Sequence, residues 1–475
     1  MSIANSRLTR PDAVDASCRL PVLKAVVCGL AWLLAGLALL LGASILQHQP
    51  AWGGCEYFGY GKMAAAARVA LIYGFAVPTG LAVGLWVLFR SAGTNVRTGL
   101  AVAAGSVIWN LGVISGVAGI IAGEGTGLRG FEFPAYTGGI LLAGYLLMGV
   151  ATLVSYGIGS KAGLRFPQLM VLAAMVWFPW LLTTAQIMLV WMPVRGVLTA
   201  LTAAWYEQSL MWGVLVPLTL AGLWQLRDDS KEIGLPRPVL ATFGYWSLLV
   251  VAGWLGASTL VGGPVPAWVA STGVVAGVLL IIPVVLIGLN LFGGTGRVGG
   301  SLAILSGLSF LAAGVATALT SLRCANSILH FTGFPMALTE LLLLGFVTLG
   351  LLSALYVVLP RLVGFAWPRT ELVVGHVGLS AVGLGLTVLP LLLGGWIQGH
   401  RLDSTSWGIN AINAGLINCL RIRSLGLLVL FGAQVVFLAH WAMLCIRHFP
   451  VVKQFTLGLI QEEILTARAT VRSAK

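Results

Sequence analysis

Three charged residues and two histidines lie inside or near stretches of the sequence that are otherwise apolar. Glu340 lies in the first half of one long apolar run, and Arg68 and Glu207 lie in two others. Charges buried in a membrane are costly and normally pair, so these residues are candidates for a buried ion pair or, for the two acids, a proton relay. His376 and His440 offer imidazole nitrogens that suit a haem iron. The alternative for both histidines is a hydrogen bond at a helix interface.

The composition indicates the environment in which these residues act. Of 475 residues, 58% are hydrophobic and 9% are charged, and the mean hydropathy is +0.97. Such a chain is a polytopic membrane protein, and its long apolar runs predict helices because a helix satisfies its own backbone in lipid. We predict an all-α fold with about twelve transmembrane helices. The expected spans are 22–47, 64–90, 98–122, 136–158, 167–193, 200–225, 238–261, 267–292, 299–321, 335–360, 371–396 and 425–446.

The basic residues predict the orientation of the chain. Most Lys and Arg residues fall in the N-terminal segment, in alternate loops and in the C-terminal tail, as the positive-inside rule expects of cytoplasmic segments. We expect a multi-pass protein of the bacterial inner (cytoplasmic) membrane, with a cytoplasmic N-terminus at 1–21, one membrane domain at 22–446 and a cytoplasmic tail at 447–475. This pattern accounts for the net charge of +13, so the expected partner is the lipid bilayer and not nucleic acid.

The six cysteines do not form a cofactor motif. The sequence has neither the C-x-x-C-H motif of c-type haem attachment nor the paired C-x-x-C of a zinc site. Cys55, Cys324 and Cys419 are expected together at the outer face of the membrane. A disulfide among them is one outcome there, and free thiols near helix ends are the other.

The stretch 326–360 resembles a known family. It is similar to the tenth helix of subunit I in the cbb3-type cytochrome c oxidases, a branch of the haem-copper oxidases. The residues that match are Asn326, Ser327, His330, Thr332, Ala354, Leu355, Tyr356 and Pro360. Five more segments resemble helices of that subunit in the same order, at 60–75, 203–213, 250–268, 394–400 and 420–432. The resemblance implies a haem-copper oxidase subunit I-like bundle.

The resemblance does not extend to the ligands of the metal centres. The family uses six histidines to bind two haem irons and one copper, and the matching positions here hold Ala67, Gln208, Ser258, Thr259, Leu338 and Glu340. Imidazole suits iron and copper, whereas amides and hydroxyls are poor substitutes. We therefore predict no cofactor. The alternative is a b-type haem held by His376 and His440, and a lipid or quinone in the former haem cavities is left open.

The residues that replace the haem ligands suggest a polar contact of a different kind. Arg68 directly follows Ala67, and Glu340 stands across the site that the low-spin haem occupies in the family. Because arginine offers a bidentate fork to a carboxylate, we predict a buried polar bridge between Arg68 and Glu340, with Glu207 and Gln208 as further members. The alternative is that Arg68 extends to the outer interface while Glu340 is protonated or paired elsewhere.

Three functions follow from this combination of features. The first is a non-catalytic, haem- and copper-free membrane scaffold of a respiratory or electron-transfer complex that docks membrane-anchored c-type cytochrome subunits. The second is a haem-binding terminal oxidase or nitric oxide reductase subunit, an activity that needs the missing ligands. The third is a proton or solute pathway through the same bundle.

Overall fold

All the long elements of the computed structural model are helices, and the residues it describes are 12–159, 163–228, 237–292, 298–404 and 406–473. The first half of the chain contains α1 (Ala13–His48), η2 (Pro50–Gly53), η3 (Glu56–Phe58), α2 (Tyr60–Val69), η4 (Ala70–Ala76), α3 (Val77–Ala92), α4 (Gly99–Ala122), α5 (Ala135–Gly159), α6 (Phe166–Gln186), η5 (Ile187–Trp191), α7 (Val197–Leu210), η6 (Met211–Leu215) and α8 (Val216–Asp228). The second half contains α9 (Pro238–Leu255), η7 (Gly256–Leu260), α10 (Ala267–Leu279), α11 (Ile281–Gly288), α12 (Gly300–Thr320), α13 (Arg323–Leu329), α14 (Phe334–Glu340), η8 (Leu341–Thr348), α15 (Leu349–Val363), α16 (Thr370–Asp403) and α17 (Ile409–Ser473).

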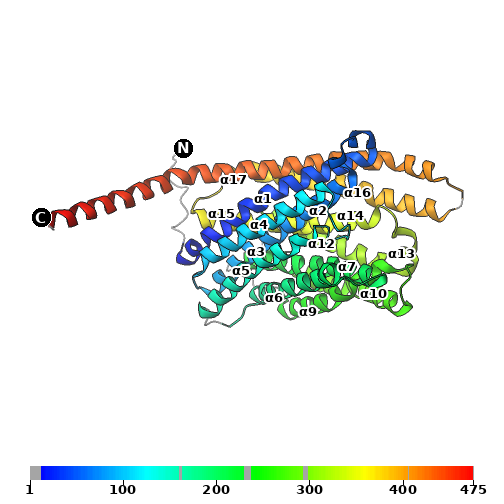
Figure 1. Cartoon of the computed structure of the whole chain (residues 1–475), viewed down its shortest axis with the longest axis horizontal. Coiled ribbons are helices and arrows are strands. Elements are labelled where there is room, and N and C mark those ends of the chain that lie inside the picture. Colours follow the sequence, from blue (N-terminus) through cyan, green and yellow to red (C-terminus); the bar gives the residue numbers. More distant parts are fainter. Residues whose placement is uncertain (1–11, 160–162, 229–236, 293–297, 405, 474–475) are drawn as a thin grey trace.

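The helices form one elongated bundle. Helix α17 runs along one side of the bundle, and its C-terminal part projects beyond it (Figure 1). In the described residues, 11 helical segments are long and apolar enough to cross a membrane. The continuous segment made of α7, η6 and α8 has a similar length. The prediction of an all-α, multi-pass membrane protein is therefore confirmed.

The helices extend further than the predicted spans. The first helix begins at Ala13 and not at residue 22, and α17 runs from Ile409 to Ser473, far beyond the predicted span 425–446. Hydropathy marks the part of a helix that matches the hydrocarbon core of a bilayer. Polar turns at either end of that part carry no such signal, although the backbone stays helical.

Two of the spans form the centre of the bundle. In the segments Tyr60–Ala92 and Phe334–Val363, 94% of the most apolar window is buried, compared with 39–50% in the other candidate spans. Each central segment contains a π-helical stretch, η4 in the first and η8 in the second, and η6 gives the segment after Val197 a third one. An inserted π turn shifts the direction of the side chains that follow it and is frequent at functional sites.

Polar contacts fix the end of the bundle where α1 begins. The indole nitrogen of Trp86 donates to the buried carboxylate of Asp15 at 2.9 Å, and Arg90 pairs with Asp12 and, at 3.6 Å, with Asp15. Arg19 donates to the backbone carbonyl of Leu362 at 2.8 Å. These contacts hold the start of α1 against the ends of α3 and α15.

Candidate functional site: two cavities at one end of the bundle

Two cavities lie in the half of the bundle where α1 ends and α14 begins. The larger, of about 370 Å³, is bordered mainly by α7, η7, α12, α13 and α14 and presents many hydroxyl and amide side chains, so we call it the hydroxyl cavity. The smaller, of about 220 Å³, is bordered by α1, α2, α14, η8 and α17 and includes three arginines, so we call it the arginine cavity. Arg129, Glu207, Met211 and Thr339 line both cavities and thus separate them.

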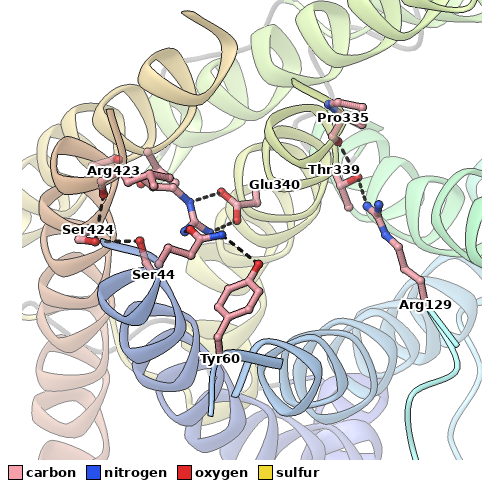
Figure 2. Close-up of polar contacts among 12 residues, drawn as sticks. Ser44, Tyr60, Arg129, Pro335, Thr339, Glu340, Arg423 and Ser424 are labelled. Atoms are coloured by element: carbon pink, nitrogen blue, oxygen red, sulfur yellow. Dashed lines mark hydrogen bonds and ion pairs between the residues drawn. The ribbon is translucent and has the colours of Figure 1, made fainter. Parts of the chain in front are cut away.

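A buried ion pair between α17 and α14 borders the arginine cavity (Figure 2). The Arg423 side chain is only 2% exposed and the Glu340 side chain 10%. Nη2 of Arg423 contacts Oε1 of Glu340 and Nε lies 3.4 Å from Oε2, so the guanidinium faces both carboxylate oxygens. Nη1 donates to the side-chain oxygen of Gln47 at 3.0 Å, and the Gln47 amide donates to the Tyr60 hydroxyl at 2.9 Å. The network joins α1, α2, α14 and α17.

Two further buried acids at this end of the bundle, Glu132 and Glu207, also pair with arginines. Arg68 Nε lies 2.5 Å from Oε1 of Glu132, whose side chain is 4% exposed. Arg129 Nε lies 2.8 Å from Oε1 of Glu207. Arg129 also donates from Nη2 to the Thr339 hydroxyl at 3.0 Å (Figure 2). Each of these buried acids thus has a separate cationic partner, which is the arrangement expected of charges placed in a membrane.

The loop 123–134 supplies two of the paired residues because it folds into the bundle. Phe131 and Phe133 are fully buried and pack with their ring centroids 4.3 Å apart. The Tyr73 hydroxyl donates to the backbone carbonyl of Gly130 at 2.9 Å and lies 2.6 Å from the hydroxyl of Tyr206. These contacts hold the loop in place, so Arg129 reaches the cavity walls and Glu132 reaches Arg68.

Substitution of Tyr73 by phenylalanine tests this anchor. Tyr73→Phe is expected to lower the free energy of unfolding by about 1–2 kcal/mol, because the Gly130 carbonyl and the Tyr206 hydroxyl both lose a buried partner. Chemical unfolding of the purified protein in detergent measures the change. Tyr136→Phe is the matched control, since Tyr136 is 52% exposed and its hydroxyl donates to the carboxylate of Glu124 at the surface. Equal stability of the two variants would contradict the anchoring role.

The positions aligned with the family's metal ligands divide between the two cavities. Gln208, Ser258, Thr259 and Leu338 all line the hydroxyl cavity. Glu340 lines the arginine cavity, beside Arg68. Ala67 is fully buried in α2 and precedes Arg68 directly. Four segments that are far apart in the sequence thus bring the aligned positions to one end of the bundle.

The predicted pairing within the polar bridge is not the pairing in the structure. Arg68 and Glu340 line the same cavity, as does Glu207, but Arg68 pairs with Glu132 and Glu340 pairs with Arg423. Gln208 faces the hydroxyl cavity instead. The sequence prediction missed Glu132, and it assigned Arg423 to the segment before the last span. The F-E-F sequence at 131–133 was the available signal, because an acid between two phenylalanines suggests a buried loop.

His376 and His440 lie far along the bundle from both cavities, near the end of α15. Both are fully buried. Nδ1 of His376 lies 2.9 Å from the Tyr356 hydroxyl, and the backbone N–H of Arg369 donates to Nε2 of His440 at 3.4 Å. The rings of Tyr356 and Phe437 pack against His376, and that of Trp367 packs against His440. These contacts favour the alternative in which both histidines serve a helix interface.

The three cysteines expected at one face are free thiols in the structure, as are the other three. Cys55 and Cys324 are exposed, and Cys419 is partly buried on α17, where its sulfur faces Gly394 of α16. The structure therefore agrees with free thiols near helix ends and not with a disulfide among the three.

Comparison with known proteins gives a likeness of fold. No protein-family model matches the chain, and no curated protein matches it. Among solved structures, a chain of a haem-copper terminal oxidase dimer, determined by cryo-electron microscopy, superposes with a TM-score of 0.68. The match covers 90% of this chain and 83% of that chain at 10% sequence identity. The predicted haem-copper oxidase-like fold is therefore confirmed.

The side chains of the two cavities do not fit the metal centres that such a fold implies. Within the described ranges, no three His, Cys, Asp or Glu side chains are grouped closely enough to hold a metal ion. The hydroxyl cavity presents amides, hydroxyls and one imidazole, that of His330, and these do not form a haem-copper ligand set. In the arginine cavity, both carboxylate oxygens of Glu340 face Arg423. The residues at these positions therefore suit polar contacts and not iron or copper ligation.

Proposed function

We propose that this chain is a non-catalytic membrane scaffold of a respiratory or electron-transfer complex, related to the cbb3-type branch of subunit I and free of haem and copper. It docks membrane-anchored c-type cytochrome subunits, and electrons move through those subunits and not through this chain. The scaffold lies in a bacterial inner membrane with both termini in the cytoplasm. Its membrane domain spans 22–446 between short cytoplasmic segments at 1–21 and 447–475.

One observation carries this proposal. The fold resembles that of a haem-copper terminal oxidase chain, yet none of the positions assigned to the metal ligands holds a histidine: four of them line the hydroxyl cavity and Glu340 pairs with Arg423. The ion pair of Glu340 with Arg423 illustrates the replacement, because a carboxylate that faces a guanidinium with both oxygens is stable without a metal. A bundle that keeps its shape in this way keeps its outer surfaces for partner subunits.

Haem analysis of the purified chain tests the proposal directly. The reduced-minus-oxidised visible spectrum and the pyridine haemochrome assay are expected to show no b-type haem bound to the chain. Any haem that copurifies from native membranes is expected to resist extraction with acidified acetone, because c-type haem is covalently attached to its protein. Mass spectrometry of the copurified subunits would then identify the cytochromes that the scaffold docks.

The opposite result would support the oxidase or nitric oxide reductase alternative. Stoichiometric, extractable b-type haem on the isolated chain would overturn the scaffold proposal. His376→Ala and His440→Ala would then be the first variants to examine, because these residues are the candidate axial ligands. A chain without haem that purifies with no cytochrome would favour a solute or proton pathway, which transport assays in proteoliposomes would test.

A further inference from the structure

Three hydroxyls in the lining of the hydroxyl cavity, which we call the acceptor wall, have their hydrogens engaged by the backbone. The hydroxyls of Ser258 and Thr259 donate to the carbonyls of Leu255 and Gly256 at 2.7 and 2.8 Å. The Thr320 hydroxyl likewise donates to Ala316, within its own helix, at 2.8 Å. A hydroxyl has one hydrogen and two lone pairs. Because the hydrogens are engaged by the backbone, the atoms left for a ligand are acceptors.

Ser321 and Asn326 also belong to the lining of the cavity. The Ser321 hydroxyl donates to the Thr317 carbonyl at 2.8 Å. Asn326 is 8% exposed and lines the cavity, and its side-chain oxygen is buried without a hydrogen-bond partner among the described residues. A buried acceptor without a partner is unfavourable, so a ligand donor that reaches the Asn326 oxygen would remove this penalty.

Apolar side chains, which we call the apolar wall, also line the cavity. Leu338 and Leu342 come from α14 and η8, Ala203 comes from α7, and Trp212 comes from η6. Leu338, Leu342 and Trp212 are at most 8% exposed. A molecule that fills the cavity therefore needs C–H groups that meet the apolar side chains and O–H or N–H donors that meet the acceptor wall.

The cavity carries no net charge that would select an ion. Arg129 and Glu207, the two charged residues in its lining, pair with each other at 2.8 Å. Burial, and secondly the positive charge of Arg129, lower the pKa of His330, so this imidazole is neutral at pH 7. A neutral ligand therefore fits the cavity better than an anion or a metal cation.

We infer that the hydroxyl cavity binds a small cyclic polyol, a six-membered ring whose C–H face lies on the leucines and whose hydroxyls donate to the acceptor wall. The cavity volume of about 370 Å³ lies at the small end of the range for ligand sites, which suits a single ring. The inference rests on the haem-free part of the proposed function. The haemochrome assay tests that part separately, and binding does not depend on a docked cytochrome.

Equilibrium dialysis of the full-length purified protein with radiolabelled myo-inositol tests the inference. Saturable binding to one site per chain is expected, with competition by unlabelled inositol. Cyclohexanol is the matched probe, since it has the same ring with a single donor, and it is expected not to compete at equal concentration. The absence of saturable binding up to about 10 mM would overturn the inference. Equal competition by cyclohexanol would do the same, because it would mean that only the apolar wall acts.

Two pairs of variants locate the site. Thr320→Val removes one acceptor from the cavity. Thr387→Val is its control, because Thr387 is fully buried in α16 and its hydroxyl makes the same 2.8 Å bond to a carbonyl of its own helix. Thr320→Val is expected to weaken inositol binding about tenfold, the value of one hydrogen bond, while Thr387→Val leaves it unchanged. Asn326→Leu is expected to have at least the effect of Thr320→Val. Wild-type affinity in Thr320→Val would place the bound inositol elsewhere and overturn the inference.

Discussion

Glu340→Leu is expected to lower the free energy of unfolding by about 3–5 kcal/mol, because it leaves the Arg423 guanidinium buried without its counter-charge. The exposed fractions of 2% and 10% for the two side chains mean that bulk solvent compensates little for the lost partner. Arg423 would keep only its bond to Gln47. Unfolding of the purified protein by heat, or by increasing concentrations of a denaturing detergent, measures the loss of stability. A lower yield of the variant from membranes is expected to accompany it.

The double variant separates the pair from its individual residues. Glu340→Leu combined with Arg423→Leu is expected to be far more stable than Glu340→Leu alone, because apolar replacement of a whole buried ion pair is often neutral. Glu56→Leu is the control for removal of an acid, since Glu56 is exposed in η3 and its loss is expected to change stability by less than about 0.5 kcal/mol. A Glu340→Leu protein as stable as the wild type would show that the two residues do not form a buried pair.

The sequence predicted the spans and the positions of the cavities better than it predicted the contacts inside them. Hydropathy identifies the length of chain that suits lipid. The resemblance of short segments singled out Gln208, Ser258, Thr259 and Leu338, and all four line one cavity in the structure. Both signals are local to single helices. They could be applied without knowledge of how the helices pack.

The partners of the charged residues depend on packing and therefore escaped prediction. Arg68 and Glu340 belong to the two central spans and line one cavity, so a pair between them was a reasonable expectation. The loop 123–134 folds inward and brings Glu132 to Arg68, so Arg68 pairs with Glu132 and not with Glu340. Arg423 falls just outside the predicted span 425–446, whereas α17 begins at Ile409 and makes Arg423 part of a buried helix face. Hydropathy contains no information on either point.

The crossing of α4 and α5 depends on glycines, and its disruption is the second large effect that we expect. A Cβ atom on Gly144 would lie 2.6 Å from the backbone nitrogen of Trp109, and one on Gly105 would lie 2.9 Å from the carbonyl oxygen of Gly144. Small residues allow such close approach of membrane helices, where packing is the main source of stability. Because backbone atoms cannot rotate away as side chains can, Gly144→Leu is expected to cost about 3 kcal/mol or more.

The same substitution is expected to disturb the candidate site as well as the fold. Trp109 of α4 donates from its indole nitrogen to the backbone carbonyl of Tyr73 at 2.7 Å, and Tyr73 anchors the loop that carries Arg129 and Glu132. Gly139→Leu is the matched control on the same helix, since a Cβ there meets nothing within 4 Å. We expect Gly144→Leu to lose both stability and inositol binding, and Gly139→Leu to keep both. Loss of stability with unchanged binding would show that α4 supports the bundle without positioning the cavities.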